Sequence, residues 1–174
     1  QDIYNIYGFV RFADEIVDSF HDYDKEFLFS KFEQDLTDAL EHKISLNPIL
    51  NSFQYTVNKY NIPQEMIDAF MKSMRLDLSK SEYKTTEEYQ EYIYGSADVV
   101  GLMCLKVFVN GNEEKYNELK DSAMRLGSAF QKVNFLRDLK ADFEELSRTY
   151  FPNTDLNHLD EKSKQEIIAD IESD

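Results

Sequence analysis

The chain has 174 residues and a mass of 20.5 kDa, which is enough for one domain that buries its own core. Aromatic residues make up 14% and the apolar set 42%, which excludes an intrinsically disordered chain, and five glycines with three prolines favour long helices over a turn-rich β-fold. The formal net charge of −15 would repel nucleic acid, so we expect no nucleic-acid partner.

A single cysteine, Cys104, excludes an internal disulfide and a cysteine-based zinc site. It lies in the apolar run of residues 99–105, where we expect an inert buried thiol. No apolar stretch approaches the ~20 residues of a membrane-spanning helix. No signal peptide is visible, although the chain begins with Gln1 rather than Met. These features fit a reducing, cytoplasmic location.

The spacing of apolar residues predicts a succession of helices with short breaks. Amphipathic patterns predict the first two helices over about residues 2–20 and 24–42. Asn47-Pro48, a cap followed by proline, begins the third, and Pro63 begins a fourth that continues to about residue 78.

The second half of the chain continues this pattern with longer helices. Thr85-x-x-Glu88 is a capping box that opens a helix to about residue 109, where Asn110-Gly111 turns the chain. A long helix is expected over about 112–146, then a loop over 147–157 and a last helix from about 160. The fold class is therefore all-α, a helical bundle forming one domain over residues 1–174.

Polar residues form a stripe on the first predicted helix. At 100° per residue, its members fall within about 60° of one another: Tyr7, Arg11, Asp14 and Asp18. A solvated charged face would give the same spacing. However, two like charges one turn apart repel each other unless a cation lies between them.

The long helix over 112–146 repeats this arrangement. Its stripe spans about 80° and carries two more carboxylates one turn apart, with Arg137 at its edge: Gly127, Gln131, Asn134, Asp138 and Asp142. Mg²⁺ takes oxygen ligands, commonly one or two carboxylates completed by substrate phosphates and water. Two opposed carboxylate pairs would therefore hold several Mg²⁺ ions and a diphosphate.

Small residues interrupt the helix between these two. Gly95, Ser96, Ala97 and Gly101 lie inside it, although each glycine costs about 1 kcal/mol relative to alanine. Something must approach this backbone closely, and both a neighbouring helix and an apolar ligand would explain the small residues.

As a set, these residues resemble the squalene and phytoene synthases. Residues 7–18 resemble the first aspartate-rich helix of that family, and Met74-Arg75-Leu76-Asp77 is similar to a segment of phytoene synthases. Residues 92–101 are similar to the family's helix of aromatic and small residues. Residues 131–142, followed by Arg148-x-Tyr150-x-Pro152, resemble its second aspartate-rich motif and the loop after it. The resemblance spans residues 3 to about 155, in the family's order.

The resemblance implies an isoprenoid-synthase-type helical bundle around a central cavity, and a Mg²⁺-dependent transferase that condenses two prenyl diphosphates head to head through a cyclopropylcarbinyl diphosphate. It implies that Asp14, Asp18, Asp138 and Asp142 hold two or three Mg²⁺ ions and that Tyr92 lies near the developing cation. The implied diphosphate-binding residues are Tyr7, Arg11, Gln131, Asn134, Arg137, Arg148 and Tyr150. Cationic groups and aromatic faces suit a leaving diphosphate and a carbocation independently of the resemblance.

Met74-Arg75-x-Asp77 favours condensation of two C20 diphosphates to phytoene, a step of carotenoid biosynthesis, and leaves squalene-type or dehydrosqualene-type condensation of C15 substrates open. NADPH is expected only for a squalene-type reaction. The implied partner is the prenyl diphosphate, with peripheral membrane contact for product release, and the oligomeric state stays open.

Some residues depart from the family pattern. Glu15 stands where many members have aspartate, and Lys140-Ala141-Asp142 replaces a commoner Gly-Glu-Asp. The chain also begins inside the first motif helix, so we expect it to be truncated at both ends.

Other function classes fit less well. A non-catalytic prenyl-diphosphate-binding relative stays open, although the intact carboxylate pairs disfavour it. A di-iron bundle would need Glu-x-x-His pairs, which the sequence lacks, and a terpene cyclase would carry a different second metal motif.

Overall fold

The structure is a computed structural model that describes residues 1–80, 82–144, 150–151 and 161–174, and for residues 139–144 it describes the backbone alone. These residues form helices and turns with no strand among them, in agreement with the all-α prediction. The elements are α1 (Asp2–Asp18), α2 (Lys25–His42), α3 (Pro48–Tyr60), α4 (Gln64–Asp77), α5 (Thr86–Ile93), the π-helical turn η1 (Tyr94–Asp98), α6 (Val99–Phe108), α7 (Glu113–Glu144) and α8 (Glu161–Glu172).

Side chains cap several helices where the sequence predicts their first residues. The Asn47 side chain accepts hydrogen bonds from the two backbone N–H groups that follow Pro48, and Thr85 accepts one from the backbone of Glu88. The carboxylate of Glu88 in turn accepts a hydrogen bond from the backbone N–H of Lys84. The predicted first residues of α3 and α5 therefore lie within one residue of those observed, whereas the loop predicted over 147–157 lies largely outside the described residues.

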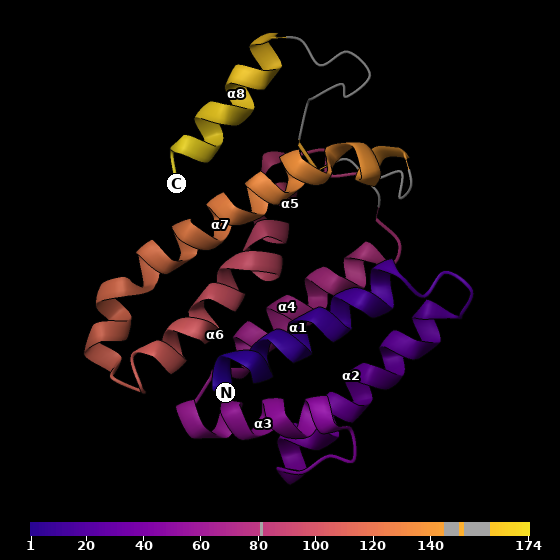
Figure 1. The fold of residues 1–174 in the computed structure, drawn as a ribbon, viewed down its shortest axis with the longest axis vertical. Helices are drawn as coiled ribbons and strands as arrows, with labels where there is room; N and C mark the ends of the chain where they lie inside the picture. Colours follow the sequence, from indigo (N-terminus) through magenta and orange to yellow (C-terminus); the bar gives the residue numbers. More distant parts are fainter. Residues whose placement is uncertain (81, 145–149, 152–160) are drawn as a thin grey trace.

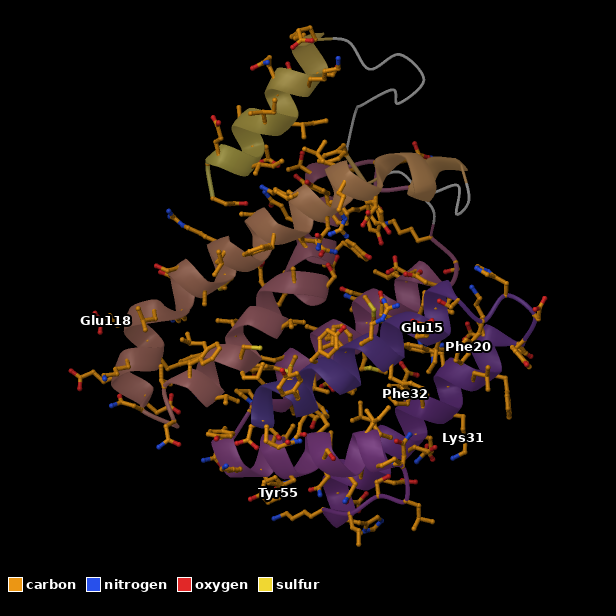
Figure 2. All side chains as sticks on the ribbon, viewed as in Figure 1. Glu15, Phe20, Lys31, Phe32, Tyr55 and Glu118 are labelled. Atoms are coloured by element: carbon orange, nitrogen blue, oxygen red, sulfur yellow. The ribbon has the colours of Figure 1, made fainter. Side chains whose placement is uncertain are left out.

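Helix α1 occupies the centre of the bundle, in contact with α2, α3, α4 and α6 (Figure 1). Its apolar side supplies Phe9, whose fully buried ring stacks on Phe53 with centroids 3.9 Å apart and lies 6.0 Å from Phe32, one of the side chains labelled in Figure 2. The largest core thus forms around α1 and fixes the orientation of its polar side.

Helices α7 and α8 complete the described structure on the other side of α6. The long α7 packs along α6 and η1, and α8 lies against α7 (Figure 1). A second, smaller core forms here from aromatic side chains and two isoleucines: Tyr83, Tyr89, Tyr92, Ile93, Phe135, Tyr150, Phe151 and Ile167.

The predicted continuous helix over 85–109 contains the π-turn η1, which the sequence did not indicate. Two neighbouring helices close on this turn. A Cβ atom on Gly95 would lie 2.6 Å from the carbonyl oxygen of Ala69 in α4, and one on Gly127 of α7 would lie 3.1 Å from the carbonyl oxygen of Ala97. The π-turn therefore lies where the helix is held between α4 and α7.

Candidate functional site

The polar stripe predicted on α1 lies on its half-exposed side. Arg11 contacts two carboxylates through separate nitrogens, Asp14 at 2.5 Å and Glu15 at 2.5 Å. Burial and the nearby charge of Asp18 raise the pKa of Asp14 to about 6, against the lowering effect of Arg11. Tyr7 is 62% exposed on the same helix. The Arg11 guanidinium thus lies between the carboxylates of Asp14 and Glu15.

The stripe on α7 is arranged around Arg137. Its guanidinium donates two hydrogen bonds to the carboxylate of Asp138, at 2.8 and 2.5 Å, and this contact lowers the pKa of Asp138. Asn134 and Gln131 are half-buried, one and two turns before Asp138 respectively. The side chain of Asp142 and the whole of Arg148 lie outside the described residues.

The two carboxylate stripes come from helices on either side of α6 (Figure 1). Within the described part of the chain, no three His, Cys, Asp or Glu side chains lie close enough together to hold a metal ion. Convergence of the four aspartates on one Mg²⁺ cluster therefore stays a prediction.

An apolar groove of about 460 Å³ runs between η1, α6 and α7. Its walls are mostly small or apolar side chains: Ser96, Ala97, Val100, Gly101, Cys104, Leu105, Phe108, Ala123, Leu126, Gly127, Phe130 and Gln131. Phe108 and Phe130 are 73% and 64% exposed, so one side of the groove is open. The groove reaches Gln131, the first polar residue of the α7 stripe.

The small residues of η1 and α6 serve two purposes, close packing of helices and lining of the groove. Gly95 is required for a close helix crossing, because its Cβ would overlap α4. Gly101 has two roles. It allows a close helix crossing, since a Cβ there would lie 3.0 Å from the carbonyl oxygen of Ala123, and it also lines the groove. Ala97 and Cys104 line the groove. Helix packing and an open apolar space therefore both account for the run, at different positions.

Tyr92 lies in the second core rather than among the groove-lining residues. It is 4% exposed, and its hydroxyl donates a hydrogen bond of 2.6 Å to Asp77. Tyr83 donates a second, longer bond of 3.3 Å to the same carboxylate, and the ring of Tyr150 stacks on Tyr92 with centroids 5.4 Å apart. Burial, followed by the charge of Asp77, raises the pKa of Tyr92 well above its usual value, so the phenol is neutral.

Asp77 is therefore a candidate site residue that the sequence argument did not assign. The segment that contains it is similar to one in phytoene synthases, and its hydrogen bond with Tyr92 joins the end of α4 to α5. Arg75 of the same segment points elsewhere: it contacts Glu26 at 2.5 Å and also pairs with Glu33, which ties α4 to α2.

Comparison with known proteins identifies the family to which the two polar stripes and the groove belong. The family model for squalene/phytoene synthase matches residues 1–170. The chain belongs to the squalene/phytoene synthase family. Phytoene synthase 1 of Solanum lycopersicum is 29% identical over 157 residues, which are 88% of this chain and 38% of that protein. Phytoene synthase 2 of Zea mays is 31% identical over the same length, with 39% of its chain covered. The chain thus spans about two fifths of the length of these curated relatives.

Solved structures of this family share the fold. The squalene synthase HpnC from Alicyclobacillus acidocaldarius is 27% identical, with a TM-score of 0.72 over 87% of this chain and 55% of that chain. A dehydrosqualene synthase in complex with ligand gives a TM-score of 0.82 at 22% identity, over 99% of this chain and 64% of that chain. The isoprenoid-synthase-type bundle expected from the sequence is confirmed.

The α1 stripe has the donor chemistry for the family's divalent metal. Asp14 and Asp18 offer carboxylate oxygens one turn apart, and the pKa of Asp14 is raised first by burial and then by the charge of Asp18, both of which a bound cation would offset. Two protein carboxylates completed by substrate phosphates are a usual Mg²⁺ environment.

None of the described helices is both long and apolar enough to cross a membrane.

Proposed function

We propose that this chain takes part in the Mg²⁺-dependent head-to-head condensation of two prenyl diphosphates with release of diphosphate. The observation that carries the proposal is the apolar groove that ends at Gln131, in a chain matched by the family model over residues 1–170. An apolar chain would occupy the groove, and its diphosphate would lie toward the polar stripe of α7.

The proposed substrate is geranylgeranyl diphosphate and the proposed product phytoene. The similarity to phytoene synthases over 88% of the chain supports the C20 substrate, together with Met74-Arg75-x-Asp77. A C15 substrate is the alternative, because HpnC, at 27% identity, is a squalene synthase. A hydrocarbon of either length is insoluble in water, so we propose release at a membrane surface by an otherwise cytoplasmic protein.

The residues of the two stripes receive separate roles. Asp14 and Asp18 would hold Mg²⁺ from α1, and Asp138 with Asp142 would do so from α7. When bound, the metal neutralises the departing diphosphate. Donor side chains would bind the diphosphate oxygens directly and orient the substrate: Tyr7, Arg11, Gln131, Asn134, Arg137, Arg148 and Tyr150.

Tyr92, which lies in the second core and does not line the groove, would act on the cation through the electrostatics of its aromatic ring. Its hydroxyl is occupied by Asp77, so the phenol is held in one orientation, and an aromatic face stabilises positive charge by its quadrupole. Apolar groove walls would keep water from the reacting carbons.

The single cysteine provides a direct test of the groove. Cys104 lines it and is half-buried, so a bound prenyl chain should shield the thiol from a small maleimide. At ten times Kd only about one site in eleven is empty, and alkylation should slow about tenfold. We expect this protection with Mg²⁺ and a non-hydrolysable C20 diphosphate analogue, and no protection with Mg²⁺ and inorganic diphosphate.

Thermal melting tests the polar half of the site separately. Mg²⁺ with inorganic diphosphate should raise the melting temperature more than Mg²⁺ alone, and diphosphate alone should have almost no effect. Asp14→Asn should abolish the added shift, whereas Asp68→Asn, an exposed aspartate on α4, should retain it. An equal shift with diphosphate alone would refute the metal-bridged site, and mass spectrometry of the hydrocarbon would separate the C40 from the C30 product.

A further inference from the structure

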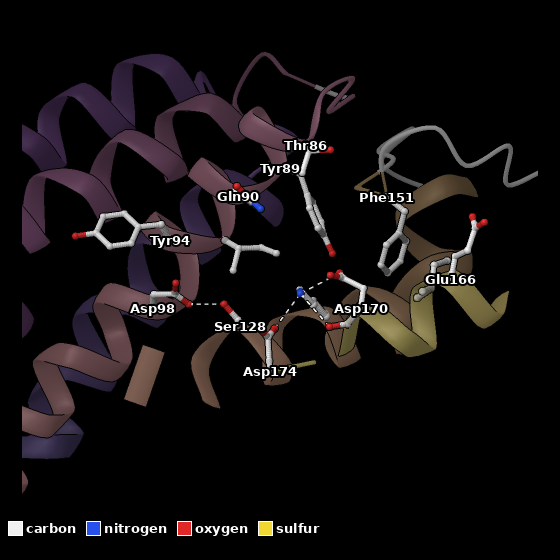
Figure 3. A pocket seen from close by; sticks show the side chains of 13 residues that line it. Thr86, Tyr89, Gln90, Tyr94, Asp98, Ser128, Phe151, Glu166, Asp170 and Asp174 are labelled. Carbon is white, nitrogen blue, oxygen red and sulfur yellow. Dashed lines mark hydrogen bonds and ion pairs between the residues drawn. The ribbon is translucent and has the colours of Figure 1, made fainter. Parts of the chain in front are cut away.

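A second cavity, of about 510 Å³, lies between α5, η1, α7 and α8 (Figure 3). It shares none of its lining residues with the apolar groove. Its walls combine aromatic and aliphatic side chains with many polar ones, and its volume suits a small organic ligand. None of the residues assigned to prenyl diphosphate or Mg²⁺ lines it.

The hydroxyl of Tyr89 points into this cavity without a hydrogen-bond partner in the described structure (Figure 3). The residue is only 6% exposed. Burial and the charges of Asp170 and Asp174 raise the pKa of Tyr89 above its usual value, so the group is a neutral phenol. A buried hydroxyl without a partner is costly, and a ligand that supplies one would bind here with a gain.

The charged side chains around the cavity determine which charge that ligand should carry. Lys132 is the cation among the lining residues, with its side chain 8% exposed, and it is held by both Asp170 and Asp174 at 2.9 Å. Two carboxylates on one ammonium leave an excess negative charge. Asp98 and Glu166 add further carboxyl groups. An anion such as a diphosphate would therefore be repelled.

The geometry also selects the kind of cation. No three carboxylate, His or Cys side chains of the described residues cluster closely enough to hold a bare metal ion. Asp98 is 7% exposed, and the bond of 2.9 Å from the Ser128 hydroxyl is its one hydrogen bond within the described part of the chain. It can therefore accept an N–H donor, as can the phenol oxygen of Tyr89.

We propose that this cavity binds an aliphatic polyamine, a set of ammonium groups on a short alkyl chain. The ammonium groups would donate to Asp98 and to the hydroxyl of Tyr89, and the faces of Tyr94 and Phe151 suit a cation and its alkyl stem. This site is separate from the prenyl diphosphate site and does not depend on the proposed reaction.

Isothermal titration of the chain with spermidine tests the proposal. We expect one saturable site per chain, with Mg²⁺ and tetramethylammonium binding far more weakly, because neither presents N–H donors. Tyr89→Phe should weaken spermidine binding about tenfold or more, because the hydroxyl accepts a hydrogen bond from a charged ammonium group. Asp98→Asn should weaken it about tenfold or more, because a charged acceptor is lost.

Matched controls separate a built site from the general attraction of a chain of net charge −15 for polycations. Tyr55→Phe on α3, at the end of the molecule away from α8 (Figures 1 and 2), and Asp68→Asn on α4 should leave the affinity unchanged. Tyr89→Phe should not lower the melting temperature of the free chain, because the hydroxyl that it removes has no partner. Non-saturable binding, or equal weakening by Asp68→Asn and Asp98→Asn, would overturn the proposal.

Discussion

Replacement of single glycines by alanine should have opposite effects at two helical positions. In α1, a Cβ on Gly8 would lie 3.9 Å from the nearest atom, a methyl group of Ile49, which is an ordinary contact. In η1, a Cβ on Gly95 would lie 2.0 Å from the Ser73 hydroxyl oxygen and 2.6 Å from the Ala69 carbonyl oxygen. The Ser73 side chain can rotate, but the Ala69 oxygen belongs to the backbone of α4 and can move only with that helix.

The expected free energies follow from two opposing effects. Glycine to alanine inside a helix stabilises by about 1 kcal/mol, and this gain applies at both positions. Overpacking a close contact costs about 1–3 kcal/mol, and a rigid backbone atom places Gly95 at the upper end. We therefore expect Gly8→Ala to stabilise the chain by about 1 kcal/mol and Gly95→Ala to destabilise it by about 2 kcal/mol.

Urea unfolding followed by far-ultraviolet circular dichroism would measure both changes, and each kcal/mol corresponds to about 2–4 °C in the melting temperature of a chain of this size. Adding Ser73→Ala to Gly95→Ala removes the shorter contact but leaves the backbone contact, so it should recover only part of the loss. If Gly95→Ala were as stable as Gly8→Ala, the close crossing of η1 and α4 would be refuted.

Three further predictions concern the site and its supports. Burial raises the pKa of Asp98 from 3.8 to about 6. Between these pH values the folded chain holds a proton that the unfolded chain has lost, so the stability of the fold falls as the pH rises through this window. Asp98→Asn should remove this pH dependence and raise the free energy of unfolding by up to about 3 kcal/mol at pH 7, as measured by urea unfolding at pH 4 and pH 7. Asp77→Asn and Tyr92→Phe should each destabilise the chain, with a coupling energy of about 1–3 kcal/mol in a double-mutant cycle, because they share a buried hydrogen bond to a carboxylate. Ala97→Phe should fill the apolar groove and slow maleimide labelling of Cys104 in the free chain, with a loss of stability below the ~1–3 kcal/mol of core overpacking, because that wall is open; unchanged labelling in this variant would place the side chain outside the groove.

Local sequence features predicted the helices well because they act over a few residues. Asn47 with Pro48, and Thr85 with Glu88, fix the first turns of α3 and α5 by hydrogen bonds within the same segment. The π-turn η1 could not be predicted in this way. It lies where α4 and α7 both press on the helix, and the run of small residues is compatible with an α-helix as well.

The candidate site was predictable only in part, for the same physical reason. Helical periodicity places Arg11 beside Asp14 on one face, and the structure has the contact at 2.5 Å. The tie between Asp77 and Tyr92 depends on how two helices meet, which periodicity does not contain. Lys132 directly follows Gln131 in the sequence, yet it is buried on another side of α7, where it pairs with Asp170 of α8 and with Asp174 just after that helix.

The apolar groove and the second cavity both adjoin the peptide unit that joins Ala97 to Asp98. Ala97 lines the apolar groove, and the next residue, Asp98, lines the polar cavity. Gly127 of α7 lies close to both residues, because a Cβ there would lie 3.1 Å from the carbonyl oxygen of Ala97 and 3.2 Å from the Cα of Asp98. Successive residues in a helix point about 100° apart, so a single turn can present an apolar wall to one side and a carboxylate to the other. The absence of a side chain at Gly127 brings α7 close enough to close both spaces, and η1 is thus the shared wall on which the geometry of each depends.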